Sequence, residues 1–403
     1  MGQVFQGIKV ADFSWSVAGP IVTKCLADHG AFVVRIESTT HLDPIRTTRP
    51  YKDNIPGINR AGFYAAYNDN KCGISLNLNH PKGIEVAKRI VAWADIIAES
   101  FLPGTMERWG LGYNELCDIN PSVILFSTTN QGQNGPHAHQ RGFGYHLTSL
   151  AGFVHLTGWP DRGPSMISVA YTDIVSHYFS VAALVAALDY RRRTGNGQHI
   201  DISQYEASIQ FLSPLLLDFT VNRRVTGRIG NRSEYAAPHA VYPCKGEDKW
   251  CAISVLSDKQ WEGFCQVIGN PEWSKYEKFN TLSARKENED ELNNLVADWT
   301  KNFGAEEVME MMQAKGIPSG VVSNCQDIYQ NRQLQYRQHF VPLEHPEIGR
   351  YYYEGPPFIL SKTPAEIKSP SPCVGEHNEY FYTEILGMSD EEFVQLLAEG
   401  VFE

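Results

Sequence analysis

The fold is decided by residues 8–38, which read IKVADFSWSVAGPIVTKCLADHGAFVVRIES. Residues 8–14 are rich in apolar and β-branched side chains, a pattern typical of a buried strand, and residues 32–38 repeat it. The stretch between them, residues 18–31, predicts a helix that stops at Gly30. A strand, a helix and a second strand within about 30 residues form a βαβ unit, which implies a parallel sheet.

The same alternation continues along the first half of the chain. Further strands are predicted at 72–78, 95–100, 122–129 and 199–203, and further helices at 81–94 and 174–193. Ligands of an open α/β sheet bind at the carboxyl ends of its strands, which fall here near 14–19, 37–38, 99–104 and 128–133. The loop after the first strand reads SWSVAGP rather than GxGxxG, and no GxxxxGK[ST] occurs, so the sequence contains neither the dinucleotide motif nor the P-loop motif.

The character of the sequence changes near residue 225. Residues 240–245 and 250–255 predict a β-hairpin, and amphipathic helices follow at 258–269, 287–302 and 305–316. Near the end, residues 349–361 predict a strand, and a last helix begins at Ser389, with Glu392 three residues later as in a capping box. The sequence therefore predicts an α/β fold in three segments: 1–222 as the first part of a large domain with a parallel sheet, 223–330 as a smaller α+β domain, and 331–403 as a return segment that completes the large domain.

Composition excludes several classes of protein. The 403 residues carry a formal net charge of -11, a balance that argues against nucleic acid as the main partner because phosphate binding requires a basic face. The N-terminus lacks a secretory signal pattern and no run of about 18 apolar residues occurs, so we expect no membrane span and a cytoplasmic location. The eight cysteines form no CxxC pair, which indicates free thiols, and no His and Cys spacing matches a metal site.

Asp173 is the first residue that suggests chemistry, because it precedes the long apolar helix predicted from 174 to 193. One interpretation is an N-cap, whose side chain accepts a backbone N–H two or three residues on. The other is a nucleophile, since a helix N-terminus favours the ionised carboxylate and a carboxylate shielded from water can attack a substrate. His177, four residues later, shares its face and either orients Asp173 or is a satisfied core histidine. The residues alone leave these interpretations open.

Two arginines lie in glycine-containing surroundings beside predicted strand ends. Arg108 belongs to FLPGTMERWGLGY and Arg141 to HQRGFGYH. Each is either an ordinary surface arginine or part of a clamp on phosphates, for which the guanidinium fork is suited. Phe101, which opens the first of these segments, either stacks on a flat ring or belongs to the core.

Eight blocks of sequence, spread in order over nearly the whole chain, carry a family resemblance. They are GIKVADFSWSVAGP, VVRIES, NKCGISLNLNHPKG, ADIIAESFLPGTMERWGLGY, GQNGP, YRRRTGNGQHIDIS, GIPSGVV and GEHNEYFYTEILGMSDEEFVQLLAEG. Together they resemble the class III CoA-transferase family, which includes formyl-CoA transferase, carnitine CoA-transferase and α-methylacyl-CoA racemase. The resemblance implies a Rossmann-like, CoA-binding large domain with a small domain inserted, and an interlocked dimer, either a homodimer or a heteromer with a related chain.

The resemblance also implies roles for individual positions. Asp173 occupies the position of the family's nucleophilic aspartate, ahead of the helix that ends in RRRTGNGQ. The matching CoA contacts are Val17 and Ala18 after the first strand, Leu76, Asn77 and Leu78 in GISLNL, Ser100 and Phe101, and the two arginines Arg108 and Arg141. Coenzyme A enters as part of an acyl-CoA substrate, and we expect neither a permanently bound cofactor nor a metal.

The implied activity is the transfer of CoA from an acyl-CoA donor to a free carboxylic acid. In this mechanism Asp173 attacks the thioester to give an aspartyl anhydride, and the released thiolate then forms an aspartyl-CoA thioester. Water must be kept away because anhydrides hydrolyse, and we expect Phe143, Tyr145 and Tyr171 to supply the apolar surroundings.

The chain departs from known members of the family at two informative places. Formyl-CoA transferase has an arginine after RIE, where this chain has Ser38, and Arg46 is a candidate to replace that charge. The racemase branch has a histidine base where this chain has Phe143, and racemisation needs two acid/base groups, so the sequence favours transfer. The alternatives are an α-methylacyl-CoA racemase, epimerase or CoA-ester isomerase, and a CoA-binding helper subunit of a heteromeric transferase.

Overall fold

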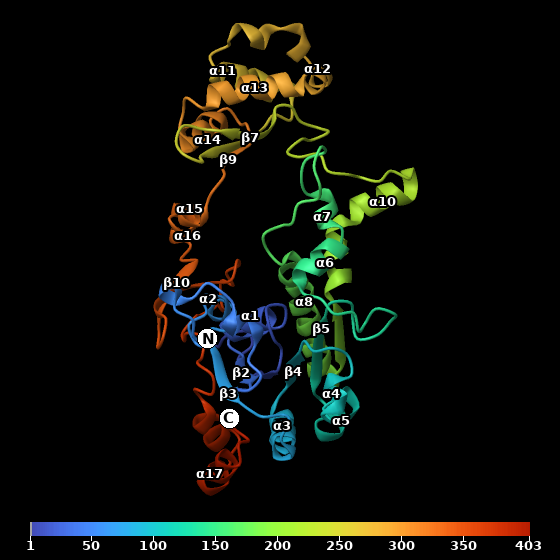
Figure 1. Ribbon diagram of the computed structural model, residues 1–403, viewed down its shortest axis with the longest axis vertical. Coiled ribbons are helices and arrows are strands. Elements are labelled where there is room, and N and C mark those ends of the chain that lie inside the picture. Colours follow the sequence, from blue (N-terminus) through green and yellow to red (C-terminus); the bar gives the residue numbers. More distant parts are fainter. Residues whose placement is uncertain (1) are drawn as a thin grey trace. The chain divides into compact units, whose positions relative to one another are not determined.

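The computed structural model describes residues 2–403, and the chain divides into two compact units (Figure 1). Unit 1 comprises the chain up to Phe153, Ile167–Arg224 and Arg332–Glu403, and unit 2 comprises Val154–Met166 and Val225–Asn331. The predicted domain boundaries after residues 222 and 330 remain a prediction, and they lie within two residues of these divisions. Residues 154–166 also belong to unit 2, and no pattern in the sequence predicted this.

Unit 1 is built on a six-stranded parallel sheet, which confirms the predicted α/β class. Its strands are β1 (Lys9–Asp12), β2 (Phe32–Glu37), β3 (Lys71–Ser75), β4 (Ile96–Glu99), β5 (Ile124–Thr129) and β6 (His199–Ser203). They lie side by side in the order β3-β2-β1-β4-β5-β6. This is the order of doubly wound nucleotide-binding folds, in which the winding reverses between β1 and β4 and ligands bind at that point.

The sheet separates two apolar layers, because neighbouring residues of a strand point to opposite faces. Val10 packs in a core with α1 (Pro20–Asp28) and α8 (Tyr171–Thr194), whereas Ala11 packs in a second core with α3 (Pro81–Trp93). Both residues are fully buried. The central strands therefore have no solvated face, as expected for a parallel sheet covered by helices on both sides.

Shorter helices and a hairpin complete unit 1. They are α2 (Gly62–Ala65), α4 (Thr105–Arg108), α5 (Tyr113–Ile119), α6 (Gly144–Leu150), α9 (Gln204–Ile209), α10 (Ser213–Asn222), β10 (Phe340–His345), β11 (Gly349–Glu354), α16 (Arg332–Tyr336) and α17 (Asp390–Ala398). The predicted strand from 349 ends at Glu354, well before residue 361. The predicted cap of the last helix is present, since the Ser389 hydroxyl accepts the backbone N–H of Glu392 (3.2 Å).

The longest helix, α8, begins at Tyr171, three residues before the predicted start, and is closed by Gly195 with a φ of 78°. Within residues 2–403 it is the only helix long and apolar enough to cross a membrane, and core helices of soluble proteins meet the same criterion. It packs against α1, α6 and α9, while apolar side chains such as Tyr178 and Val185 stay exposed. The interlocked dimer expected from the resemblance stays a prediction.

Unit 2 contains the predicted hairpin, extended by one strand. The strands β7 (His239–Pro243), β8 (Trp250–Ser254) and β9 (Ser319–Val321) form an antiparallel sheet in that order. Its helices are α11 (Asp258–Val267), α12 (Leu282–Glu287), α13 (Glu289–Thr300), α14 (Ala305–Gln313) and α15 (Cys325–Tyr329), while α7 (Phe153–Leu156) lies where the chain passes from unit 1 into unit 2. Ile253, Phe264 and Leu292 lie in one buried core, so unit 2 has an apolar centre of its own, as the α+β prediction requires.

Candidate active site

Asp173 lies in the first turn of α8, as the third residue of the helix. The N-cap position belongs to Ala170, because the helix begins two residues before Asp173 rather than after it. Within residues 2–403 the structure gives no hydrogen bond or ion pair to the carboxyl oxygens of Asp173. The N-cap interpretation is therefore wrong, and the half-buried carboxyl group is unused by the fold.

The ionisation of Asp173 also differs from the expectation. Burial raises the pKa of this carboxyl group to about 7, so the helix N-terminus does not keep it fully ionised. Near neutral pH the residue is divided between its protonated and ionised forms. A carboxylate that is poorly solvated and accepts no hydrogen bond is more basic than a surface aspartate, and this favours attack on a carbonyl.

Gly144, the first residue of α6, faces this carboxyl group. A Cβ atom at residue 144 would lie 2.6 Å from both Cγ and Oδ1 of Asp173. The carbonyl of Gly144 accepts a hydrogen bond from Thr148 Oγ1 (2.6 Å) within α6. It also accepts one from Thr172 Oγ1 (3.2 Å), which links the start of α6 to the start of α8. The absence of a side chain at residue 144 thus provides the room that the Asp173 carboxyl group occupies.

Tyr67 is a further neighbour that the sequence pattern does not indicate. Its pKa is raised by burial and by the nearby carboxylates of Glu354 and Asp173. Its ring lies edge-on to that of Phe63, with centroids 5.7 Å apart. The electrostatic effect places the Tyr67 hydroxyl within range of the Asp173 charge, although the two residues are far apart in the sequence.

His177, Phe143 and Tyr145 do not have the roles around Asp173 that the sequence predicted. The Nδ1 atom of His177 is hydrogen-bonded to the backbone carbonyl of Ile174, so this ring does not orient Asp173. Phe143 and Tyr145 are 66% and 45% exposed, and within unit 1 they do not shield the carboxyl group from water. Tyr171 is half-buried and contacts Phe153 edge-on, with centroids 4.9 Å apart.

A cavity of about 240 Å³ opens at the carboxyl edge of the parallel sheet, where ligand binding was predicted. We call it the β-edge cavity. Its lining comes from the ends of β1 to β4: Phe13, Trp15, Ile36, Glu37, Ser38, His41, Leu76, Asn77, Leu78, Asn79, Phe101 and Trp109. Four residues expected to contact CoA, Leu76, Asn77, Leu78 and Phe101, are therefore brought together by the fold.

Aromatic rings form one wall of the β-edge cavity. The ring of Phe101 meets that of Trp15 at 5.7 Å and that of Trp109 at 5.3 Å between centroids, both edge-on. Ser100, which precedes Phe101, fixes the backbone of Trp15: its hydroxyl accepts the Trp15 N–H (2.8 Å) and lies 3.3 Å from the Trp15 carbonyl. The sequence analysis missed both tryptophans; each lies next to a predicted site residue or strand end, which was the available signal.

The remaining expected contacts lie outside the β-edge cavity. Val17 and Ala18 are buried in the loop between β1 and α1. Arg108 is exposed and donates to Thr105 Oγ1 (3.0 Å). Arg141 is exposed, and the structure of residues 2–403 gives it no ion pair.

Arg46 does not take over the charge that Ser38 lacks. Its guanidinium is fully buried and pairs with both carboxylate oxygens of Glu37, at 2.9 and 2.7 Å. It also lies over the ring of Tyr64, 3.5 Å from the centroid. Arg46 is thus held in the buried core by these contacts and is not free to bind a substrate phosphate.

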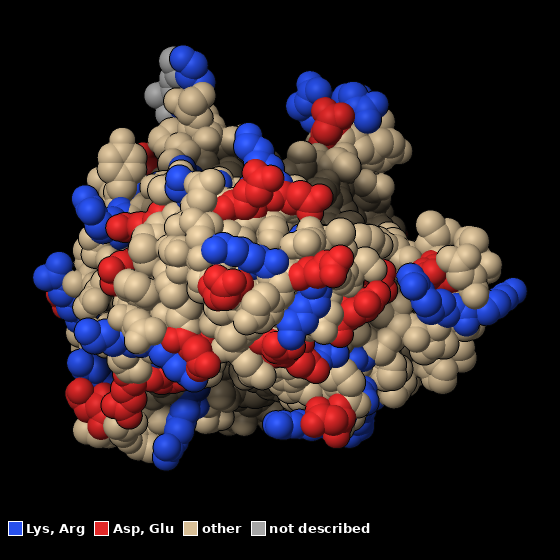
Figure 2. All heavy atoms as spheres, turned by 90° about the horizontal axis from the view of Figure 1, so that it is seen from above, with Lys and Arg blue, Asp and Glu red and all other residues tan. Residues whose placement is uncertain are grey.

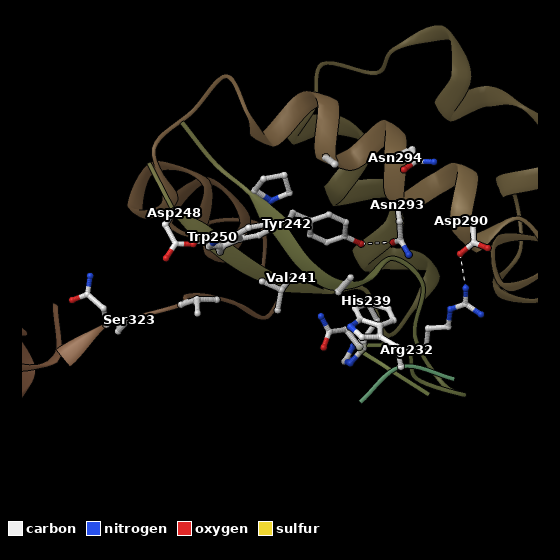
Figure 3. Close-up of a pocket in the computed structure, with 17 residues that line it drawn as sticks. Arg232, His239, Val241, Tyr242, Asp248, Trp250, Asp290, Asn293, Asn294 and Ser323 are labelled. Carbon is white, nitrogen blue, oxygen red and sulfur yellow. Dashed lines mark hydrogen bonds and ion pairs between the residues drawn. The ribbon is translucent and has the colours of Figure 1, made fainter. Parts of the chain in front are cut away.

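Unit 2 contains a larger cavity of about 880 Å³, lined by residues of β7, α13 and the segment after β9 (Figure 3). Several of its polar groups are paired within the wall. The Tyr242 hydroxyl donates to Asn293 Oδ1 (2.6 Å), and the Trp250 indole N–H donates to Asp248 Oδ1 (2.8 Å). None of the residues expected to bind CoA or to act in catalysis lines this cavity.

The charged and metal-ligating side chains of the described residues are dispersed. Figure 2 shows Lys and Arg interspersed with Asp and Glu on the face seen from above, without a continuous basic surface there. All eight cysteines are free thiols. In the part of the chain that the structure describes, no three His, Cys, Asp or Glu residues are grouped to hold a metal ion.

The family follows from comparison of the whole chain with known proteins. The model of CoA-transferase family III matches residues 5–378, which include Asp173, Gly144 and every residue that lines the β-edge cavity. The chain belongs to CoA-transferase family III. As a family III enzyme it is a CoA-transferase, and acyl-CoA thioesters are the substrates of that class.

Two characterised relatives from Chloroflexus aurantiacus cover almost the full length of this family III enzyme. It is 30% identical to succinyl-CoA–D-citramalate CoA-transferase over 394 residues, covering 98% of this chain and 97% of the relative. It is 31% identical to the beta subunit of succinyl-CoA–L-malate CoA-transferase over 402 residues, again covering 98% and 97%.

The fold agrees with that of a solved family member. A CAIB/BAIF family protein from Brucella suis superimposes with a TM-score of 0.87 and 29% sequence identity, covering 96% of this chain and 100% of that protein. Of the two relatives from Chloroflexus aurantiacus, one is named as a subunit of a malate transferase, whereas the name of the other mentions no subunit.

Proposed function

We propose that the protein transfers CoA from succinyl-CoA to a small dicarboxylic acid, with Asp173 as the nucleophile. The donor and the acceptor class are taken from the names of the two relatives, which use succinyl-CoA with D-citramalate and with L-malate. The observation that carries the choice of nucleophile is the Asp173 carboxyl group, which is half-buried, without hydrogen-bond partners among residues 2–403, and facing the bare Cα of Gly144.

The proposed reaction proceeds through two covalent forms of Asp173. An Asp173 oxygen attacks the succinyl thioester carbonyl, the C–S bond breaks, and an aspartyl-succinyl anhydride and CoA thiolate result. The thiolate attacks the Asp173 carbonyl carbon, which releases succinate and leaves an aspartyl-CoA thioester. The acceptor carboxylate then attacks this thioester to give a second anhydride, and the thiolate attacks its acyl carbon, which releases the new acyl-CoA and restores Asp173.

We assign the β-edge cavity to the nucleotide end of the CoA thioester. Its aromatic wall of Trp15, Phe101 and Trp109 is suited to a purine base, because aromatic rings stack on a flat base without depending on its identity. Arg108 and Arg141 are the proposed phosphate contacts, since both are exposed and neither has an ion pair among the described residues. Val17, Ala18, Leu76, Asn77, Leu78 and Ser100 complete the proposed CoA site.

The test of the nucleophile compares two aspartates of the same helix. Asp173→Ala is expected to abolish exchange between succinyl-CoA and a dicarboxylic acid, because both proposed covalent intermediates form on this carboxyl group. Asp189→Asn is the matched control, since Asp189 lies near the other end of α8 and, among the described residues, pairs only with Arg192 and Arg193. Intact-protein mass spectrometry after incubation with succinyl-CoA should show added covalent mass on the unsubstituted chain and on Asp189→Asn. Turnover by Asp173→Ala near that of the unsubstituted chain would refute the assignment.

The racemase and helper-subunit alternatives have separate readouts. Solvent deuterium entering the α-carbon of an acyl-CoA without an acceptor acid would indicate a racemase or epimerase. Because one relative is a named subunit of a malate transferase, a related second chain is the partner to test. A purified chain that is inactive alone and active with that partner would indicate a heteromer rather than a homodimer.

A further inference from the structure

The last residues of the described chain form part of the surroundings of the β-edge cavity. The backbone carbonyl of Val401 accepts the N–H of Asn77 (2.9 Å), and Asn77 lines the cavity. The ring of Phe402 stacks on Tyr382 with centroids 4.0 Å apart, and both Val401 and Phe402 are buried. The segment is therefore fixed beside the cavity by a backbone hydrogen bond and by packing.

Glu403 reaches from this fixed segment to the loop after β2. Its Oε1 atom accepts hydrogen bonds from Ser38 Oγ (3.0 Å) and from Thr40 Oγ1 (2.8 Å). The Thr40 hydroxyl also lies 3.2 Å from Nδ1 of His41. Ser38 and His41 both line the cavity, so Glu403 is bonded to one lining residue directly and to the other through the Thr40 hydroxyl.

The loop of residues 38–41 has few other restraints. Thr40 and His41 are exposed. The next anchor along the chain is Asp43, whose carboxylate accepts the Ser16 N–H (3.0 Å) and lies 2.5 Å from the Arg35 guanidinium. Among residues 2–403, Glu403 is the only residue from a distant segment to which residues 38–41 are hydrogen-bonded.

We propose that Glu403 is a positioning residue for the nucleotide end of the CoA thioester, holding residues 38–41 as one wall of the β-edge cavity. This inference rests on the proposed function, which assigns the cavity to that part of the substrate. Glu403 acts through Ser38 and Thr40 and has no part in the chemistry at Asp173. Its loss should therefore weaken binding of substrates that carry the nucleotide and leave the chemical step unchanged.

The test uses two substitutions and two thioesters. Glu403→Ala removes the acceptor, whereas Glu403→Gln keeps a side-chain oxygen that can accept from both hydroxyls. For succinyl-CoA we expect Glu403→Ala to raise KM by about tenfold with kcat unchanged, in line with the loss of two hydrogen bonds to a charged acceptor. Glu403→Gln should restore KM to within about threefold. For succinyl-pantetheine, which lacks the nucleotide, kcat/KM should be the same in all three proteins.

Two controls separate the possible failures. Glu399→Ala removes a nearby exposed carboxylate that pairs with Lys82 (2.5 Å), and it should leave both KM values unchanged. Equal losses with succinyl-CoA and succinyl-pantetheine would show general damage and overturn the positioning role, as would an unchanged KM in Glu403→Ala. No CoA transfer by the unsubstituted chain, alone or with a related partner, would instead refute the proposed function, and calorimetric titration with CoA itself would then decide whether Glu403 still affects CoA binding.

Discussion

The carboxyl group of Asp173 occupies the space that a side chain at Gly144 would fill, with Cγ and Oδ1 of Asp173 only 2.6 Å from the position of a Cβ at residue 144. The two residues lie in the first turns of two helices, α6 and α8, so the fit depends on how these helices pack against each other. Thr172 of α8 donates to the Gly144 carbonyl of α6 and so links the two helix starts. Placement of the carboxyl group is therefore sensitive to one methyl group.

Gly144→Ala is expected to displace the Asp173 carboxyl group and to lower kcat. Displacement of the proposed nucleophile by about 1 Å is expected to lower the rate by about 10- to 100-fold. The added methyl group would also lie 2.6 Å from Cβ of Ala170, so a moderate decrease in Tm should accompany the loss. Gly142→Ala is the matched control, because the nearest atom there is 3.3 Å away and kcat should stay within about twofold. Normal turnover by Gly144→Ala would contradict the proposed site geometry.

The pH dependence of turnover should reflect the raised pKa of Asp173. In the proposed mechanism only the ionised form attacks the thioester, and burial raises the pKa of this carboxyl group to about 7. Activity should therefore increase as pH rises from 6 to 8, with a midpoint near 7 in kcat/KM for succinyl-CoA. A profile that is already flat at pH 5 would mean that the carboxyl group is far better solvated than the structure indicates.

Asp173→Asn should stabilise the folded chain at high pH. A carboxyl group whose pKa is higher in the folded state than in the unfolded state favours folding while it is protonated. That contribution is lost as pH rises from about 4 through about 7, because ionisation then occurs in a poorly solvated place. The neutral asparagine avoids this loss, so Tm of the variant should exceed that of the unsubstituted chain by about 2 °C at pH 8. The difference should shrink at pH 5, and calorimetry at both pH values checks the sign.

The β-edge cavity should be tested through its aromatic wall. Trp109→Ala removes a ring that meets Phe101 edge-on, and it should raise KM for succinyl-CoA by about tenfold, within the range for a lost base-stacking contact. The KM for the dicarboxylic acid should not change. Trp250→Ala, in the cavity of unit 2, is the control and should leave KM for succinyl-CoA unchanged. If KM for succinyl-CoA rose in Trp250→Ala and stayed unchanged in Trp109→Ala, CoA binding would be assigned to unit 2.

Much of the fold was predictable because it is encoded locally. The strand 8–14 and the helix and strand after it have the hydrophobic pattern of a βαβ unit, and the sheet forms as that pattern requires. The start of α8 was misplaced because its cap position is Ala170, which gives no capping signal, so the polar Asp173 was the natural but wrong choice. The sequence indicated a carboxylate at this helix start, but it did not indicate that the carboxylate lacks hydrogen bonds to the described residues.

The contacts that shape the site were less predictable because they join distant parts of the chain. Glu403 is hydrogen-bonded to Ser38, 365 positions away in the sequence. The charge of Asp173 contributes to the raised pKa of Tyr67, which belongs to another part of unit 1. From sequence Arg46 is a candidate to replace the charge absent at Ser38, but its pairing with Glu37 forms only in the folded core. Residue type and spacing indicated candidate side chains, whereas the contacts of those side chains could be found only in the folded structure.

The two proposed phosphate contacts should differ from other arginines in their dependence on salt. Arg108→Gln and Arg141→Gln each remove an exposed cation without breaking an ion pair of the described chain, so KM for succinyl-CoA should rise by about 3- to 10-fold with little change in Tm. Because exposed charges are screened by salt, the effect should shrink as ionic strength rises from 0.05 to about 0.5 M. Arg192→Gln is the matched control, since that arginine is exposed but paired with Asp189, and its KM should equal that of the unsubstituted chain at every salt concentration. If all three variants behaved alike, neither arginine would be a specific phosphate contact.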